Sequence, residues 1–308
     1  MGGDRLGMRW GLAGGTTIAS VAEARRVARY ADAAGFDGLW ISHATAVDPV
    51  VALACVADDI ANLAEVGTSV VPLYGRHPIG LAQLARTAQS ALGGRFTLGI
   101  GAASRGAVAT TMGLGWEHPL AFTREFIDGL QPLLAGRPVD LDGAQLSAHV
   151  ALTIDAPATP ILLAALGPRM LELAGRRVHG TSVGQCGPRT IATHIAPAIR
   201  AAAAAAGRPD PRIMALVRIC VTDEPAPAYE LARATASRYR QVPSYAAVQD
   251  REGLADPAEL HLIGSWERVL DGLAAYGAAG ATDLRLEVAA PDEASREATR
   301  EALAAHLG

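Results

Sequence analysis

The chain has 308 residues, half of them hydrophobic, and a formal net charge of −4 at pH 7. With no long basic run, nucleic acid is not an expected partner, and no apolar run reaches the ~18 residues that a membrane span needs. The start of the chain is charged and has no apolar h-region, so we expect no signal peptide. All 27 basic residues are arginines, which excludes Schiff-base, P-loop and general-base lysines.

The cysteines are few and far apart, at Cys55, Cys186 and Cys220. They form no CxxC pair, and no Cys/His group has zinc-finger spacing. We therefore expect reduced thiols in a cytoplasmic protein. The chain also lacks an HExxH motif and a paired-carboxylate cluster, so no metal site is predicted.

Eight short apolar segments are predicted as strands, most of them bounded by Gly, Pro or a loop. Their ranges are Arg9–Ala13, Asp37–Ser42, Gly67–Leu73, Gly93–Gly101, Ile161–Leu166, Thr181–Val183, Arg212–Val221 and Asp283–Val288. Helical segments separate them. Ser20 and Glu23 have capping-box spacing before the first helix, and Asp48 followed by Pro49 starts the second. Further helices are expected at 78–92, 119–135, 168–177, 188–206, 225–240, 264–279 and 293–306.

Three segments depart from this alternation. Ala102–His118 is a long Gly-rich loop, and Pro138–Thr159 carries an alternating pattern with a turn, predicted as a small insertion after the fourth helix. Val242–Glu259 is predicted as an irregular helical segment after the seventh strand. Apolar strands joined by crossover helices imply a parallel sheet. Eight of them in about 300 residues favour an α/β protein with a closed (β/α)8 TIM barrel over an open doubly wound sheet, and we expect residues 1–308 to form one such domain.

In a barrel of this kind the active site lies at the C-terminal ends of the strands. His43 directly follows the apolar run Leu39–Ser42, so it is either an imidazole in a pocket that handles protons or contacts a cofactor, or a hydrogen-bonded structural residue. Leu166–Met170 contains Gly-Pro before a helix, which indicates either a phosphate cradle of free amides or an ordinary βα turn.

The remaining motifs give weaker evidence for a functional site. Gly99–Ser104 imitates a dinucleotide fingerprint, but the third glycine and the following helix are missing. Six further histidines are expected to be solvated or to cap helices: His77, His118, His179, His194, His261 and His306.

Several stretches, in order along the chain, resemble the bacterial luciferase-like monooxygenase superfamily, whose members are TIM barrels. The most specific is Gly-Gly-Arg-x-x-Leu-Gly-x-Gly at 93–101. The others are Ala33–His43, Thr68–Pro72, Arg76–Pro78, Pro160–Pro168 and Gly264–Glu267. Within the superfamily the chain looks closer to the branch that uses the deazaflavin coenzyme F420 than to the FMN luciferases.

That resemblance implies an oxidoreductase that transfers a hydride between C5 of F420 and a small organic substrate, and a homodimer. It places a cis peptide at Ser69–Val70 and a catalytic His43 at the hydride face. Two alternatives stay open: an FMN-dependent monooxygenase and a non-catalytic flavin-binding protein. By the same resemblance the cofactor-binding residues are Ser42, Ser69, Val70, Ala102, Ala103, Leu166, Gly167, Arg169 and Met170.

The chain departs from the F420-dependent sugar-phosphate dehydrogenases that it resembles at three positions. Ser104 stands where they have a catalytic Glu, Val47 where they have a Trp, and Ser42 where they have an acidic residue. We therefore expect an apolar or conjugated substrate rather than a sugar phosphate. Met112 and Trp116, in the Gly-rich loop, are either substrate-side residues or part of a surface loop.

Overall fold

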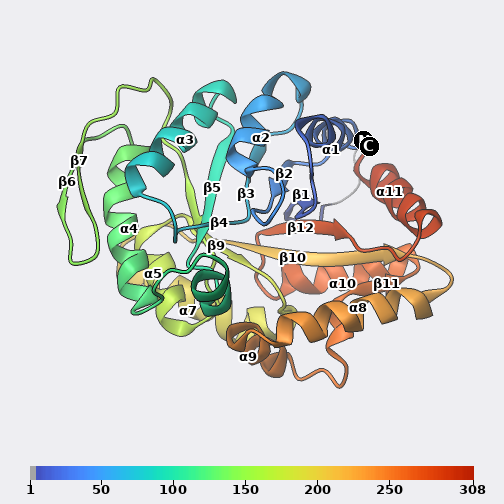
Figure 1. Cartoon of the computed structure of the whole chain (residues 1–308). Helices are drawn as coiled ribbons and strands as arrows, with labels where there is room; N and C mark the ends of the chain where they lie inside the picture. Colours follow the sequence, from blue (N-terminus) through green and yellow to red (C-terminus); the bar gives the residue numbers. More distant parts are fainter. Residues whose placement is uncertain (1–4) are drawn as a thin grey trace.

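Eight parallel strands close on themselves in the computed structural model, which describes residues 5–308 (Figure 1). Around the barrel the order is β10, β12, β1, β2, β3, β5, β8 and β9, and β9 pairs with β10 again. The bounds are β1 (Arg9–Gly15), β2 (Gly38–Ile41), β3 (Glu65–Thr68), β5 (Phe96–Gly101), β8 (Ile161–Leu163), β9 (Gly180–Val183), β10 (Arg212–Val221) and β12 (Asp283–Val288). The predicted closed α/β barrel is confirmed.

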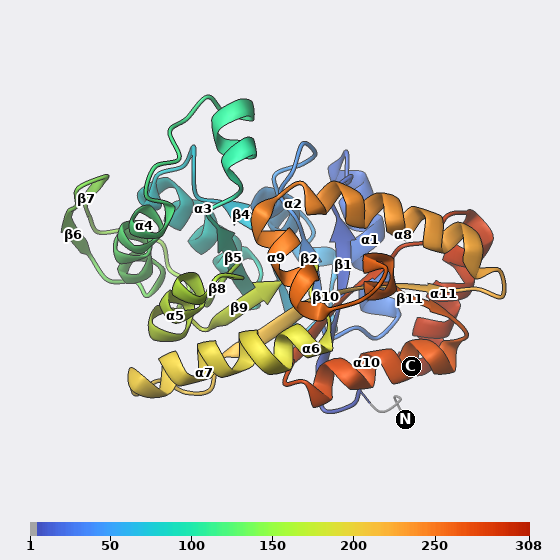
Figure 2. The ribbon, with the colours of Figure 1, turned by 90° about the horizontal axis from the view of Figure 1, so that it is seen from below.

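The helices surround the barrel (Figures 1 and 2). They are α1 (Val21–Ala33), α2 (Pro49–Cys55), α3 (Pro78–Ala91), α4 (Pro119–Leu134), α5 (Pro168–Arg177), α6 (Pro188–Thr190), α7 (Ala196–Ala205), α8 (Pro225–Arg240), α9 (Pro243–Glu252), α10 (Trp266–Ala278) and α11 (Glu293–Leu307). The predicted cap is present: Ser20 Oγ accepts from Glu23 N, and Glu23 Oε2 reaches back to accept from Ala19 N, one residue before the N-cap. No helix between residues 5 and 308 combines the length and apolarity needed to cross a membrane.

Some boundaries differ from the prediction. The third strand begins at Glu65 and is interrupted after Thr68, and β4 (Val71–Pro72) continues its pairing with β5. A short strand, β11 (Leu262–Gly264), adds to the far end of β10 and was not predicted. Its three residues carry no periodic signal of their own; only the overhang of β10 makes it a strand.

The interrupting segments have defined structure. The predicted insertion is an antiparallel hairpin of β6 (Val139–Asp142) and β7 (Ser147–Val150). The segment after the seventh strand is helical, with α9 followed by a 3₁₀ turn at Pro257–Leu260. The Gly-rich loop contains one π-helical turn at Ala107–Thr111.

The N-terminal end of the barrel is filled by side chains. Trp40 packs inside with Leu162 and Met214, and the absent side chain of Gly67 makes room for its ring: a Cβ there would lie 2.4 Å from Trp40 Cζ3. Arg212 lies over that ring and is paired with Glu65 and Asp283. These contacts close one end, so a ligand enters the barrel from the other.

Candidate active site

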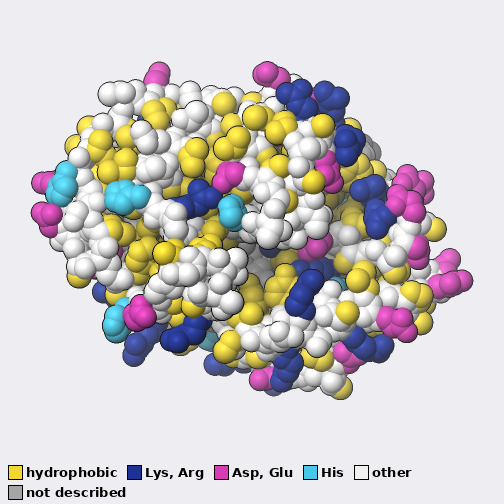
Figure 3. All heavy atoms as spheres, viewed as in Figure 1, with side chains coloured by type: hydrophobic (Ala, Val, Ile, Leu, Met, Phe, Trp, Pro, Cys, Tyr) yellow, Lys and Arg dark blue, Asp and Glu magenta, His cyan; other side chains and the backbone are white. Residues whose placement is uncertain are grey.

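A cavity of about 680 Å³ opens at the C-terminal end of the barrel. Every barrel strand, or the loop that follows it, contributes to its wall, and α8 and α9 form the remaining side. A space-filling view shows a hollow in the middle of this face, bordered by acidic, basic and histidine side chains (Figure 3). The cavity is therefore where the fold predicts an active site.

The structure brings together half of the residues expected from the sequence. Ser42, His43, Ser69, Val70 and Ala103 line the cavity. The others are not part of its lining: Ala102, which follows β5, and Leu166, Gly167, Arg169 and Met170, which follow β8.

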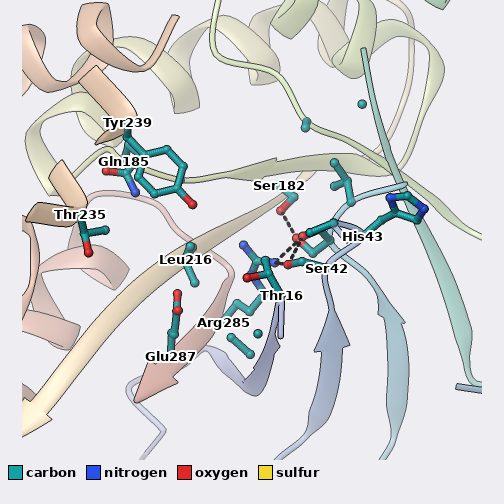
Figure 4. A pocket seen from close by; sticks show the side chains of 18 of the residues that line it. Thr16, Ser42, His43, Ser182, Gln185, Leu216, Thr235, Tyr239, Arg285 and Glu287 are labelled. Atoms are coloured by element: carbon teal, nitrogen blue, oxygen red, sulfur yellow. Dashed lines mark hydrogen bonds between the residues drawn. The ribbon is translucent and has the colours of Figure 1, made fainter. Parts of the chain in front are cut away.

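The Ser69–Val70 peptide is cis, as the resemblance implied. The carbonyl oxygen of Ser69 accepts hydrogen bonds from Ser42 Oγ and from Arg285 Nη1, both at 2.7 Å. The hydroxyl of Ser69 is 2.8 Å from that of Ser182, at the end of β9. Figure 4 shows these bonds converging at the cavity floor. The floor is thus held by side chains from β2, β9 and β12.

Arg285 was not predicted as a site residue. It lies on β12, one residue from Leu284 and Leu286, so alternation along the strand turns its side chain into the barrel. It is 7% exposed, and this burial lowers the pKa of its guanidinium to about 10. The sequence signal was a charged residue inside an apolar strand; without the closed barrel, that pattern does not say which face is the interior.

His43 lies next to an ion pair formed by Asp48 and Arg76. Its Nε2 lies 4.0 Å from Asp48 Oδ2, and the same oxygen accepts from Arg76 Nη2 at 2.8 Å. Asp48 also caps α2 by accepting from the amides of Val50 and Val51. The pKa of His43 is below its ordinary value, chiefly because the ring is desolvated and secondly because Arg76 is near, although Asp48 opposes both. The ring is therefore neutral at neutral pH.

The wall opposite His43 is polar and aromatic. Arg218 on β10 is paired with Glu287 on β12, Nε to Oε2 at 2.9 Å, and packs on the ring of Tyr239 from α8. Tyr245 from α9 meets Tyr239 edge to face with ring centroids 5.1 Å apart. These four side chains line the cavity. The sequence did not mark them as site residues: Arg218 and Glu287 are charged residues within apolar strands, and Tyr239 and Tyr245 lie in segments predicted only as a helix and as an irregular helical segment.

The two candidate residues in the Gly-rich loop, Met112 and Trp116, have different surroundings. Met112 lines the cavity, whereas Trp116 does not. Trp116 instead donates from its indole nitrogen to the carbonyl of Ala102 at 3.4 Å and packs under Arg105. Met112 thus keeps a substrate-side position, and Trp116 holds the loop to the end of β5.

The start of α5 has the features expected of an anion site at a helix terminus. Gly167 is its N-cap residue and no side chain caps the free amides. A Cβ on Gly167 would meet nothing within 4 Å, so the approach is open. His194 Nε2 is hydrogen-bonded to the carbonyl of Leu166 at 2.8 Å, which ties this turn to the next βα unit.

A family model for luciferase-like monooxygenases matches residues 8–283. The chain belongs to the luciferase-like monooxygenase family. The chain is 34% identical over 187 residues to a 5,10-methylenetetrahydromethanopterin reductase of Methanolobus tindarius, which covers 60% of this chain and 56% of that protein. It is 30% identical over 261 residues to an F420-dependent glucose-6-phosphate dehydrogenase of Beutenbergia cavernae, covering 79% and 74%.

The structure of an F420-dependent secondary alcohol dehydrogenase, in complex with an F420-acetone adduct, superposes with a TM-score of 0.81 at 18% identity, covering 97% of this chain and 99% of that one. This likeness supports the fold of the luciferase-like chain. The resemblance inferred from the motifs is thereby confirmed at the level of the family.

Within this luciferase-like barrel the other histidines differ from one another. His77 caps α3 by accepting from Ile79 N, as expected. His261 is the C-cap residue of the 3₁₀ turn at Pro257–Leu260, but it is not solvated, since it is 6% exposed; burial lowers its pKa to about 3, with Arg218 adding to the effect. Among residues 5–308, no three His, Cys, Asp or Glu side chains are grouped as metal ligands.

Proposed function

We propose that this luciferase-like protein is an oxidoreductase that uses coenzyme F420 to transfer a hydride to or from a small organic molecule. The observation that carries the proposal is the cavity floor, where His43 and Ser42 lie beside the Ser69–Val70 peptide. The F420 dependence of the Beutenbergia relative supports the choice of cofactor.

The cavity suits a flat, mostly apolar ring. Its volume of about 680 Å³ is in the usual range of about 300–1,000 Å³ for ligand pockets. The floor is bare at Gly101, where a Cβ would lie 3.0 Å from Val70 Cγ2 and 3.2 Å from Ala164 Cβ. Bare backbone there keeps the space above Val70 open. When bound, F420 supplies the ring carbon that gives or takes the hydride.

The remaining cofactor contacts follow from the strand ends. Ala103, in the left-handed region with φ of 57°, turns the chain over the cavity after β5, and we assign it and Ala102 to the ring or its side chain. The open start of α5 suits the cofactor phosphate, because its amides are uncapped and point out of the helix. The residues assigned there are Leu166, Gly167, Arg169 and Met170.

His43 is assigned the coupled proton. A neutral imidazole with a lowered pKa accepts a proton at Nε2 or Nδ1 as substrate is oxidised and returns it in the reverse direction. Asp48 and Arg76 hold its surroundings, since Asp48 caps the start of α2 and also accepts a hydrogen bond from Arg76. The residues of the cavity are therefore assigned the binding and orientation of the cofactor and substrate, and His43 the exchange of one proton.

Two measurements test the proposal. Absorbance titration with F420 and with FMN distinguishes the cofactors: a change with F420 and none with FMN supports it, and the reverse favours an FMN monooxygenase. His43→Ala is then expected to lower turnover about 100-fold or more, with a far smaller loss of cofactor affinity. Equal turnover in the wild type and in His43→Ala would show that His43 takes no part in the reaction. Cofactor binding without turnover of any substrate would favour a non-catalytic flavin-binding protein.

The small-molecule substrate, the homodimer and the cytoplasmic location stay predictions. Val21 on α1, Val51 on α2 and Leu84 on α3 are exposed apolar side chains on neighbouring helices, and we propose this side for the dimer contact. Light scattering on the purified chain tests it: a mass of one chain would contradict the homodimer.

A further inference from the structure

Arg285 is a buried arginine with neither a carboxylate partner nor a full set of hydrogen bonds among the described residues. Arg212 is paired with Glu65 and Asp283, and Arg218 with Glu287. Arg86 donates from Nη1 and Nη2 to three backbone carbonyls, although its Nε has no partner among the described residues. Arg285 uses only Nη1, toward Ser69 and Ser42, and its buried Nε has no partner in the part of the chain that the structure describes.

The charge around Arg285 is not balanced by the protein. Its nearest acidic neighbour on the same strand, Glu287, is already held by Arg218 at 2.9 Å. The guanidinium remains charged at neutral pH, because its lowered pKa is still about 10. A buried charge without a carboxylate partner is costly, so an incoming anion that neutralises Arg285 is stabilised at the cavity floor.

We propose that Arg285 is the binding site for a carboxylate group of the substrate, an assignment that rests on the proposed oxidoreductase function. Nε and Nη2 share one edge of the guanidinium, and that edge is the donor pair that a carboxylate accepts in bidentate fashion. Figure 4 shows Arg285 between Tyr239 and His43, so a molecule held by its carboxylate at Arg285 extends toward the imidazole.

The neutral groups around Arg285 favour a singly charged acid. Tyr239 and Tyr245 add hydroxyl donors to the same wall, and Gln185 adds an amide. The free edge of Arg285 offers two donors, which match the two oxygens of one carboxylate and leave the additional charge of a phosphate monoester without a partner on this guanidinium. The apolar or conjugated substrate expected from the sequence would thus carry one carboxylate, with its apolar part toward Val70 and Met112.

Isothermal titration with benzoate tests this assignment, with benzamide as the neutral analogue and phenyl phosphate as the dianion. We expect benzoate to bind, benzamide to bind at least tenfold more weakly, and phenyl phosphate to show no advantage over benzoate. Arg285→Gln should weaken benzoate binding at least tenfold. Arg137→Gln is the matched control, because it removes the same charge from an exposed position that does not line the cavity and should change affinity less than threefold.

Equal benzoate affinity in the wild type and in Arg285→Gln overturns the proposal, as does no benzoate binding, or phenyl phosphate binding tenfold more tightly than benzoate. If circular dichroism shows that Arg285→Gln does not fold, Arg285→Lys and Tyr239→Phe replace it, each expected to weaken benzoate binding about threefold or more. A separate F420 titration keeps the two hypotheses apart: loss of F420 binding refutes the proposed function, whereas Arg285-dependent benzoate binding is measured without cofactor.

Discussion

The pKa of His43 is set by two opposite charges, and removing each should move it in opposite directions. Asp48→Asn removes the carboxylate but keeps an N-cap residue for α2, so the helix should remain. Arg76 then stays as an unpaired cation near the ring, and the pKa of His43 should fall further. Arg76→Gln leaves Asp48 alone beside the ring and should raise it.

The size of the shift follows from the separation. Unit charges 4.0 Å apart, as His43 Nε2 and Asp48 Oδ2 are, interact by about 1 kcal/mol in water and about 4 kcal/mol at an effective dielectric constant of 20. The side chains of His43 and Asp48 are 25% and 29% exposed. Because water screens the interaction between them, the lower part of that energy range applies. Because one pKa unit corresponds to about 1.4 kcal/mol, Asp48→Asn should lower the pKa by about one unit.

The assay is a proton NMR titration of the ring C–H signals, with His43 assigned by comparison with His43→Ala. The double variant Asp48→Asn/Arg76→Gln is the control, since only desolvation then remains and the pKa should stay below 6.5. In the pH profile of kcat/KM, the acidic limb should move with the titration. A rise in the pKa of His43 in Asp48→Asn would refute the assignment of charges around the ring.

Two further predictions concern stability. The pKa of His261 is about 3 when folded and 6.5 ordinarily, so the unfolded chain binds the extra proton below pH 6.5, and the free energy of unfolding should fall by about 1.4 kcal/mol per pH unit from there toward pH 3. Urea denaturation at pH 7 and pH 5 should show that the free energy of unfolding falls by about 2 kcal/mol less in His261→Leu than in the wild type. Equal decreases in the two proteins would contradict the burial of the His261 ring. Gly67→Ala places a Cβ 2.4 Å from Trp40 and 2.5 Å from the carbonyl of Thr97, and should cost about 3 kcal/mol, whereas Gly167→Ala, which meets nothing within 4 Å, should change the unfolding free energy by less than about 0.5 kcal/mol.

Local sequence rules were enough for the elements and for one side of the site. Apolar runs bounded by Gly and Pro predicted the strand positions, and the Ser20–Glu23 spacing predicted a cap that the structure contains. His43 could be chosen because it follows a strand, and barrel strands end at the mouth. The precise strand ends could not be predicted, because pairing decides them: β11 is a strand only beside β10.

The residues of the cavity wall opposite His43 could not be predicted from the sequence. Ser42 and Arg285 are separated by 243 positions, and Tyr239 and Tyr245 lie in segments predicted from the sequence only as a helix and as an irregular helical segment. Arg285 on its own is a charged residue in an apolar strand, which fits either a solvent-facing edge or an interior anion site.

The sequence by itself determined which segments become strands and helices, because capping, periodicity and turn chemistry depend on residues a few positions apart. The tertiary structure alone decided the chemistry of the cavity wall. Closure of the sheet through β10, β12 and β1 brings Arg285 beneath the Ser69 carbonyl while Arg218 takes Glu287, and whether a buried charge is neutralised or left for a ligand depends on which distant side chains reach it.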